Sequence, residues 1–180
     1  MWNALTSYLK TMLLMILPAI MLVLGLLMHF SRGNFYMMHV DPEYFHLFNG
    51  LNLAIFNLAV DFIDHPGTIL QIIYALSAHV VNLLFPGNDL ISNALQDPEM
   101  FIHGASILLN LMTAVTLFGL GWYTYRFTGN LLLALLLQFM PWGTSSILSI
   151  MGRLIPETAM IMPLLLLCLL TVKFLTDKQR

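Results

Sequence analysis

The sequence is poor in charge and in cysteine. Only 9% of its 180 residues are charged and 59% are hydrophobic, whereas a soluble domain carries about 25% charged residues. This composition excludes a soluble enzyme and a disordered tail. Seven basic residues against nine acidic ones give a net charge of −2, which leaves no basic surface for nucleic acid, so no nucleic-acid partner is expected. The single cysteine, Cys168, excludes a disulfide framework and a cysteine-based zinc site.

Long apolar stretches with almost no formal charge make up most of the chain. A membrane-spanning helix needs about 20 predominantly apolar residues. This length predicts spans over residues 11–31, 66–86, 100–123, 130–150 and 155–173. Prolines inside such spans are tolerated where a neighbouring helix satisfies the freed carbonyl. We therefore expect an all-α, polytopic membrane helix bundle with about five transmembrane helices, folded as a single membrane domain over residues 1–180.

The loop between the first two predicted spans, residues 32–64, is rich in acidic groups and holds four of the nine in the chain. Residues 44–62 show helical periodicity, with an apolar face and a polar face. The apolar face consists of Tyr44, Phe48, Leu51, Ile55, Leu58 and Phe62, and the polar face of His46, Asn49, Asn57 and Asp61. This division predicts an amphipathic helix that lies in the plane of the membrane within the first external loop.

Acidic groups mark both ends of this predicted helix. Asp41 and Glu43 stand at its start, and Asp64 with His65 stands just beyond its end. Both ends are expected at the membrane surface, so these groups are candidates to line one cleft. Ionisable groups kept at a membrane usually have a functional reason to be there.

Structural explanations compete with this functional one. Asp41-Pro42-Glu43 suits a helix start, since Asp is a good N-cap, Pro favours the first helical position and Glu favours the positive end of the helix dipole. The same tripeptide recurs as Asp97-Pro98-Glu99 before the third predicted span. His39, Asp41, Glu43 and His46 are of the types that ligate zinc. They lack the HExxH-type helical spacing, so we predict no metal site formed by these residues.

The remaining polar residues in or near the spans also have two explanations. Arg126 and Arg153 each stand alone between spans. Each is expected either to reach lipid headgroups or to hold the phosphate of a lipid substrate. His29, His79 and His103 lie in spans or at their ends, and we expect them to be packed or interfacial.

Two short motifs point to a family. They are Asp41-Pro42-Glu43-Tyr44 after the first span and Asp64-His65-Pro66-Gly67-Thr68 at the start of the second. Together with the in-plane helix between them, they resemble the N-terminal part of polyprenyl-phosphate-sugar-dependent glycosyltransferases of the GT-C superfamily. The most similar branch contains protein O-mannosyltransferases and bacterial aminoarabinose transferases. Gly67 departs from the second proline usual in that family. The turn at residues 125–130 is similar to the family's connection between spans three and four.

The resemblance implies inverting transfer of a hexose or pentose from a polyprenyl-phosphate carrier to a hydroxyl of an acceptor protein or glycolipid. It implies a multi-pass protein of the bacterial cytoplasmic membrane that acts on the extracytoplasmic side of the bilayer. By analogy Asp41 is the general base and Glu43 assists or orients it. Asp64 and His65 shape the substrate pocket, and Arg126 contacts the carrier phosphate. The leaving phosphate needs a cation, so a divalent cation stays open as a cofactor. Family members are considerably longer, and we expect this chain to be a fragment.

A rival reading belongs to a different class of protein. The chain could be a small non-enzymatic polytopic membrane protein, such as a transporter subunit or an assembly factor, whose acidic loop is structural. A transporter favours ionisable groups buried in mid-span, and the charge-free segments contain none. Replacing Asp41 by Asn separates the two readings, because Asn is an equally good N-cap but cannot act as a base.

Overall fold

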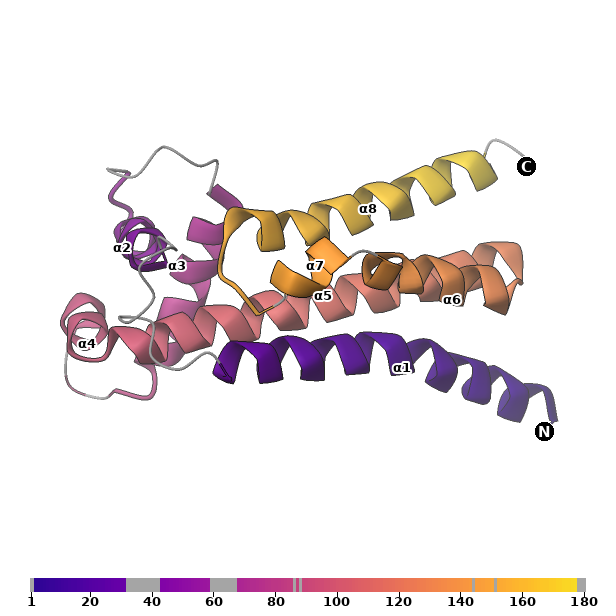
Figure 1. Ribbon diagram of the computed structural model, residues 1–180, viewed down its shortest axis with the longest axis horizontal. Helices are drawn as coiled ribbons and strands as arrows, with labels where there is room; N and C mark the ends of the chain where they lie inside the picture. The colour runs from indigo at the N-terminus through magenta and orange to yellow at the C-terminus, as the bar shows by residue number, and fades with distance from the viewer. Residues whose placement is uncertain are drawn as a thin grey trace. The chain divides into compact units, whose positions relative to one another are not determined.

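The computed structural model describes residues 2–31, 43–58, 68–85, 87, 89–143, 145–150 and 152–177. Within these ranges every regular element is helical (Figure 1), which confirms the predicted all-α class. The helices are α1 Trp2–Phe30, α2 Glu43–Ala54, α3 Thr68–Asn82, α4 Leu90–Gln96, α5 Pro98–Thr128, α6 Leu131–Phe139, the 3-10 helix η2 Met140–Gly143, α7 Ser145–Ile150 and α8 Pro156–Asp177. The chain divides into two compact units. Unit 1 contains residues 1–25, 110–151 and 160–180, and unit 2 contains residues 26–109 and 152–159.

Three helices in the described part of the chain are long and apolar enough to cross a membrane. They are the Tyr8–Phe30 segment of α1, the whole of α5 and the Pro156–Leu175 segment of α8. These segments coincide with the spans predicted at 11–31, 100–123 and 155–173. Their length and composition indicate a protein that resides in a lipid bilayer.

The other two predicted spans correspond to shorter helices. In the 66–86 segment α3 has 15 residues, which at about 1.5 Å per residue falls short of the roughly 30 Å of hydrocarbon. The 130–150 segment contains α6, η2 and α7 in succession. Pro141 lies at this break (Met140–Gly143 forms the 3-10 turn), and proline removes a helical hydrogen-bond donor. The count of five spans therefore stays a prediction.

A buried amide joins three helices of unit 1. Pro18 lies inside α1 and has no N–H, so the carbonyl of Leu14, four residues earlier, loses its helical donor. The Nε2 atom of Gln138 in α6 donates to Leu14 O at 3.0 Å and to Leu117 O of α5 at 3.1 Å. Gln138 is fully buried. A neighbouring helix thus satisfies the carbonyl that the proline frees, as expected for a proline inside an apolar span.

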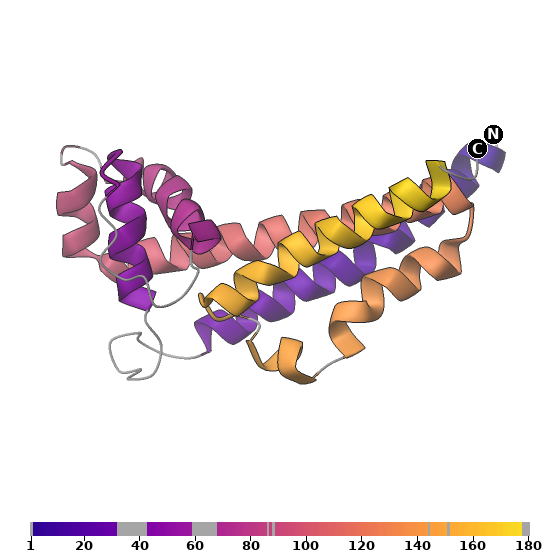
Figure 2. The ribbon, with the colours of Figure 1, turned by 90° about the horizontal axis from the view of Figure 1, so that it is seen from above.

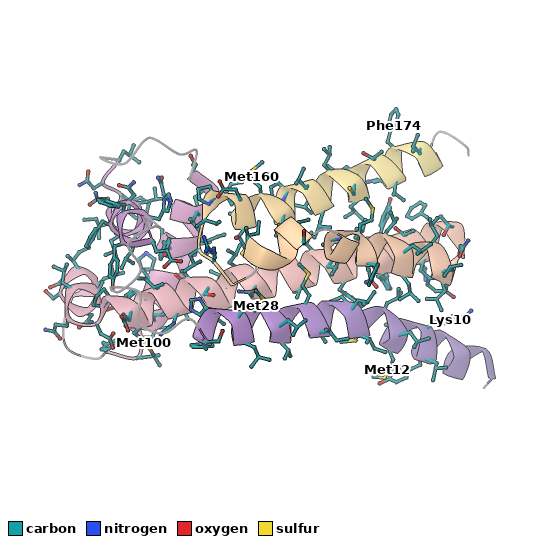
Figure 3. All side chains as sticks on the ribbon, viewed as in Figure 1. Lys10, Met12, Met28, Met100, Met160 and Phe174 are labelled. Carbon is teal, nitrogen blue, oxygen red and sulfur yellow. The ribbon has the colours of Figure 1, made fainter. Side chains whose placement is uncertain are left out.

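The close packing around this amide depends on Gly121 of α5. A Cβ atom at that position would overlap the Gln138 side chain, and small residues are the usual means by which membrane helices approach one another closely. On the outer faces of unit 1 the side chains are large and apolar instead. Met12 of α1 and Phe174 of α8 point away from the helices (Figure 3) and are 50% and 64% exposed. Such faces suit contact with lipid.

In unit 2, α2 packs against α3, as both ribbon views show (Figure 2). The start of α2 at Glu43 agrees with the helix predicted over residues 44–62, but α2 ends at Ala54. Two bonds close it, from Phe56 N to Leu53 O at 3.0 Å and from Asn57 N to Asn52 O at 2.8 Å. This is a Schellman ending with Phe56 in the left-handed region, at φ 59°. Periodicity missed the end because glycine, the usual signal, is absent from this turn.

Candidate functional site

The structure describes two of the five site residues predicted from sequence, Glu43 and Arg126. Asp41, Asp64 and His65 lie outside the described residues, so the predicted cleft between the ends of the first loop stays a prediction. Glu43 is the first residue of α2 and belongs to unit 2. Arg126 is exposed in the last turn of α5 and belongs to unit 1.

The Glu43 carboxylate is buried. The residue is only 3% exposed, and its Oε1 atom accepts a hydrogen bond of 3.3 Å from the backbone N–H of Leu154. Leu154 is itself fully buried and lies just before α8. A carboxylate in the first turn of a helix interacts favourably with the helix dipole even when it is exposed to water, so this interaction does not require burial. The burial of Glu43 therefore indicates a second role, which is to hold the segment before α8.

The side of α2 that faces the protein interior is mixed, with both polar and apolar residues. His46 and Asn49 are 0% and 3% exposed, whereas Phe45 and Phe48 are 58% and 45% exposed. The buried side of α2 therefore takes His46 and Asn49 from the predicted polar face and Leu51, which is 3% exposed, from the predicted apolar face. Gly50 lets α2 approach α3 closely, because a Cβ atom there would overlap Cβ of Tyr74 and press on the backbone carbonyl of Gln71. The in-plane position of α2 in a membrane stays a prediction.

Tyr74 of α3 adds a buried hydroxyl close to Glu43. Tyr74 is fully buried, and its Oη atom has no hydrogen-bond partner among the residues that the structure describes. Burial, the Glu43 carboxylate and the Tyr44 hydroxyl raise the pKa of the Tyr74 hydroxyl well above its ordinary value. Tyr74 therefore keeps its proton at physiological pH, as a neutral hydroxyl buried in α3.

A histidine pair that sequence analysis did not predict lies in the same unit. The Nε2 atom of His29, in α1, is 2.9 Å from Nδ1 of His103, in α5. The other ring nitrogen of His29, Nδ1, is 3.1 Å from the carbonyl oxygen of Gly152. His29 is packed as expected, with 1% exposure, but the two histidines are 74 positions apart in the sequence, which hides the pairing from any local pattern. The sequence offers one indication of this pairing, which is that both histidines lie near the ends of their helices.

The turn before α8 is held from two sides. Gly152 accepts from His29 of α1, and Leu154 donates to Glu43 of α2. Gly152 has φ 79°, a left-handed conformation that glycine adopts without strain. Arg153 lies between these two anchored residues and is half-buried. Two buried ionisable side chains thus fix the backbone on either side of one arginine.

No group of three or more histidine, cysteine, aspartate or glutamate side chains gathers within the described ranges as a metal site needs. No family model matches the chain, and no curated protein or solved structure matches it either. The resemblance to GT-C glycosyltransferases therefore rests on the motif residues themselves.

Proposed function

We propose that this chain is the N-terminal membrane portion of a glycosyltransferase that uses a polyprenyl-phosphate-linked sugar. The enzyme is a multi-pass protein of the bacterial cytoplasmic membrane. Its acceptor is a hydroxyl on the extracytoplasmic side of that membrane. The observation that supports this best is the buried Glu43 carboxylate at the start of α2, fixed by Leu154. Burying a carboxylate is costly unless it is hydrogen-bonded. The N–H of Leu154 supplies such a bond to Glu43, and a site that needs a fixed carboxylate gives a reason for keeping one buried in a chain with 9% charged residues.

The proposed reaction assigns separate roles to the two carboxylates of the motif. Asp41 removes the proton of the acceptor hydroxyl while that oxygen bonds to the anomeric carbon of the sugar. The bond from that carbon to the phosphate oxygen breaks on the opposite face, and the configuration inverts. A carboxylate within hydrogen-bond reach accelerates such a step by about 10²–10⁴-fold. Glu43, with one oxygen already bound to Leu154 N, orients the site and does not act as the base.

The leaving phosphate needs positive charge, and two arginines are candidates for it. Arg126 is exposed at the end of α5 in unit 1. Arg153 is half-buried in unit 2, adjacent to the residue that binds Glu43. A guanidinium matches phosphate geometry, and the bonds at Gly152 and Leu154 hold the backbone on both sides of Arg153. The anchored turn favours Arg153 as the phosphate-binding residue of the proposed site.

The experiment compares two aspartates that share one tripeptide. In the full-length protein that contains this chain, reconstituted in nanodiscs, Asp41→Asn is expected to abolish transfer of sugar from a polyprenyl-phosphate donor while leaving the protein folded. Asp97→Asn is the matched control, because Asp97 caps α5 through a 3.1 Å bond from Met100 N and Asn caps equally well. If Asp41→Asn transfers sugar at the wild-type rate, the proposal is wrong and a structural loop is the better explanation.

A further inference from the structure

The charged residues of the chain are sorted by sign between its two units. The residues of unit 1 include five of the seven basic residues and one of the nine acidic ones, Asp177. The residues of unit 2 include the other two basic residues, Arg32 and Arg153, and the other eight acidic ones. A chain that places its few charges so unequally has a positive part and a negative part, and this division needs a physical cause.

Each of the three helices long enough to span a membrane contributes a cation to one end of unit 1. Lys10 lies near the start of α1, Arg126 in the last turn of α5 and Lys173 near the end of α8. The Lys10 ammonium lies 5.5 Å from the centre of the Tyr125 ring, which places it beside the end of α5. Figures 1 and 2 both show the last turns of α8 at the same end of unit 1 as the first turns of α1. Lys10, Arg126 and Lys173 together form the basic end of unit 1.

The charges of α5 are spaced like the two faces of a bilayer. Glu99 lies in the first turn of α5 and Arg126 in the last, 27 positions later (99 to 126), which at 1.5 Å per residue is about 40 Å. A bilayer with its headgroup regions is about 40–45 Å thick. The residues between these two carry no formal charge. A single crossing by α5 therefore puts Glu99 and Arg126 in the headgroup regions of opposite leaflets.

The helix dipole explains only part of this pattern. It favours Glu99 in the first turn of α5 and Arg126 in the last, and its effect falls off beyond those turns. Lys10 lies about two turns into α1, nearer the positive end of the dipole, and Lys173 lies before the last turn of α8. Neither lysine gains from a dipole, so the orientation of the chain in the membrane is the better explanation for the basic end.

We propose that the basic end of unit 1 faces the cytoplasm and binds the headgroups of anionic phospholipids. Basic residues close to the ends of spans accumulate on the cytoplasmic side of a membrane. Five of the seven then do so, because Lys178 and Arg180 follow α8 in the sequence. Long basic side chains at helix ends reach the headgroups, and anionic headgroups complement their charge. Arg126 therefore contacts lipid on the cytoplasmic side, across the membrane from the proposed sugar transfer.

This orientation requires residues 130–150 to cross the membrane as well. Because α5 and α8 both end at the basic end, the chain has to return between them. The described elements in that interval are α6, η2 and α7. Gln138 of α6 donates to Leu14 O of α1 and to Leu117 O of α5, so α6 lies alongside both helices. The return crossing is therefore a helix broken near Pro141.

Cysteine labelling in bacterial spheroplasts tests the orientation. Cys168 is replaced by alanine, and one new cysteine is placed at Gln96, just before α5, or at Thr128, the last residue of α5. Both positions are exposed. A membrane-impermeant maleimide should label Gln96→Cys in intact spheroplasts and Thr128→Cys only after the membrane is permeabilised. The reverse pattern overturns the orientation, and labelling of both before permeabilisation overturns the crossing by α5.

Native mass spectrometry of the full chain tests the lipid contact. Phosphatidylglycerol should bind more tightly than phosphatidylcholine. Lys10→Gln, Arg126→Gln and Lys173→Gln should each raise the Kd of phosphatidylglycerol by about five-fold. Glu157→Gln is the matched control, because Glu157 is an exposed charge in the first turn of α8, and the Kd should not change.

The same measurement separates a lipid headgroup from free phosphate. Inorganic phosphate should not displace phosphatidylglycerol, and displacement would overturn the assignment of a lipid. Equal binding of the two lipids, or an unchanged Kd when all three cations are replaced, would overturn the headgroup site. Neither experiment measures sugar transfer, so the outcome does not depend on the proposed function.

Discussion

Replacing Gln138 by leucine should destabilise unit 1, because the amide donates to a carbonyl that its own helix cannot satisfy. Leu14 O has no helical donor, since residue 18 is a proline, and Gln138 Nε2 supplies one at 3.0 Å. Leu117 O is different. It receives the second Gln138 bond but lies in an unbroken stretch of α5 and keeps its own helical donor. Most of the stability lost on Gln138→Leu therefore comes from the carbonyl of Leu14, which is left without a donor.

The magnitude follows from these two bonds. Hydrogen bonds between membrane helices contribute about 0.6 kcal/mol on average and up to roughly 1.7 kcal/mol. A buried carbonyl left without a donor costs about 1–3 kcal/mol. The Oε1 atom of Gln138 is buried without a partner among the described residues. Removing this atom therefore partly offsets the loss in the free energy of unfolding. We expect Gln138→Leu to lower the free energy of unfolding by about 1.5–3 kcal/mol.

A double-mutant cycle with Pro18→Ala isolates the cause. Alanine restores an N–H that can donate to Leu14 O within α1, so Gln138→Leu should cost about 1 kcal/mol less in the Pro18→Ala background. The four proteins are unfolded by SDS titration in mixed micelles and followed by far-ultraviolet circular dichroism. If Gln138→Leu costs the same in both backgrounds, the amide does not act through the proline-freed carbonyl, and the reasoning is refuted.

Two further predictions concern unit 2. Tyr74→Phe should raise the free energy of unfolding by about 1 kcal/mol in the same titration, because Tyr74 Oη is buried without a partner among the described residues. A loss of stability would show that the hydroxyl is bonded. At the start of α4, bonds from the Ser92 hydroxyl and Ser92 N–H keep the pKa of Asp89 below its ordinary value. The stabilisation by Asp89 is therefore present above the unfolded-state pKa and is lost as pH falls through the lower folded value. Asp89→Ala should flatten that acid dependence of α4 stability, measured by hydrogen exchange.

The long apolar helices were predictable because hydropathy is a local property of the chain. The runs that become α1, α5 and α8 contain few charges over a length that crosses a bilayer. The interruption of the helix at residues 140–143 also had a local signal, Pro141. The prediction of a span over residues 130–150 relied on the length of the apolar stretch and did not use this signal. The end of α2 had none, since Phe56 occupies a left-handed position that usually belongs to glycine.

The candidate site was predictable only in part. The Asp-Pro-Glu tripeptide correctly placed Glu43 at a helix start, but its partner, Leu154, is 111 residues away. The His29–His103 bond is similarly long-range. Periodicity divides α2 into two faces without saying which one packs inward. That choice depends on the neighbouring helix, and the buried side of α2 combines His46 and Asn49 from one predicted face with Leu51 from the other.

The division of the chain also sets an order of events during synthesis. Unit 2 contains residues 26–109 together with residues 152–159, so its last piece leaves the ribosome well after the rest. At about 5–20 residues per second, the intervening 42 residues (110 to 151) take roughly 2–8 s to translate. During that interval the bonds from His29 to Gly152 and from Leu154 to Glu43 cannot form. The nascent chain therefore passes through a stage at which His29 and Glu43 are already synthesised but their bonds to residues 152–154 have yet to form.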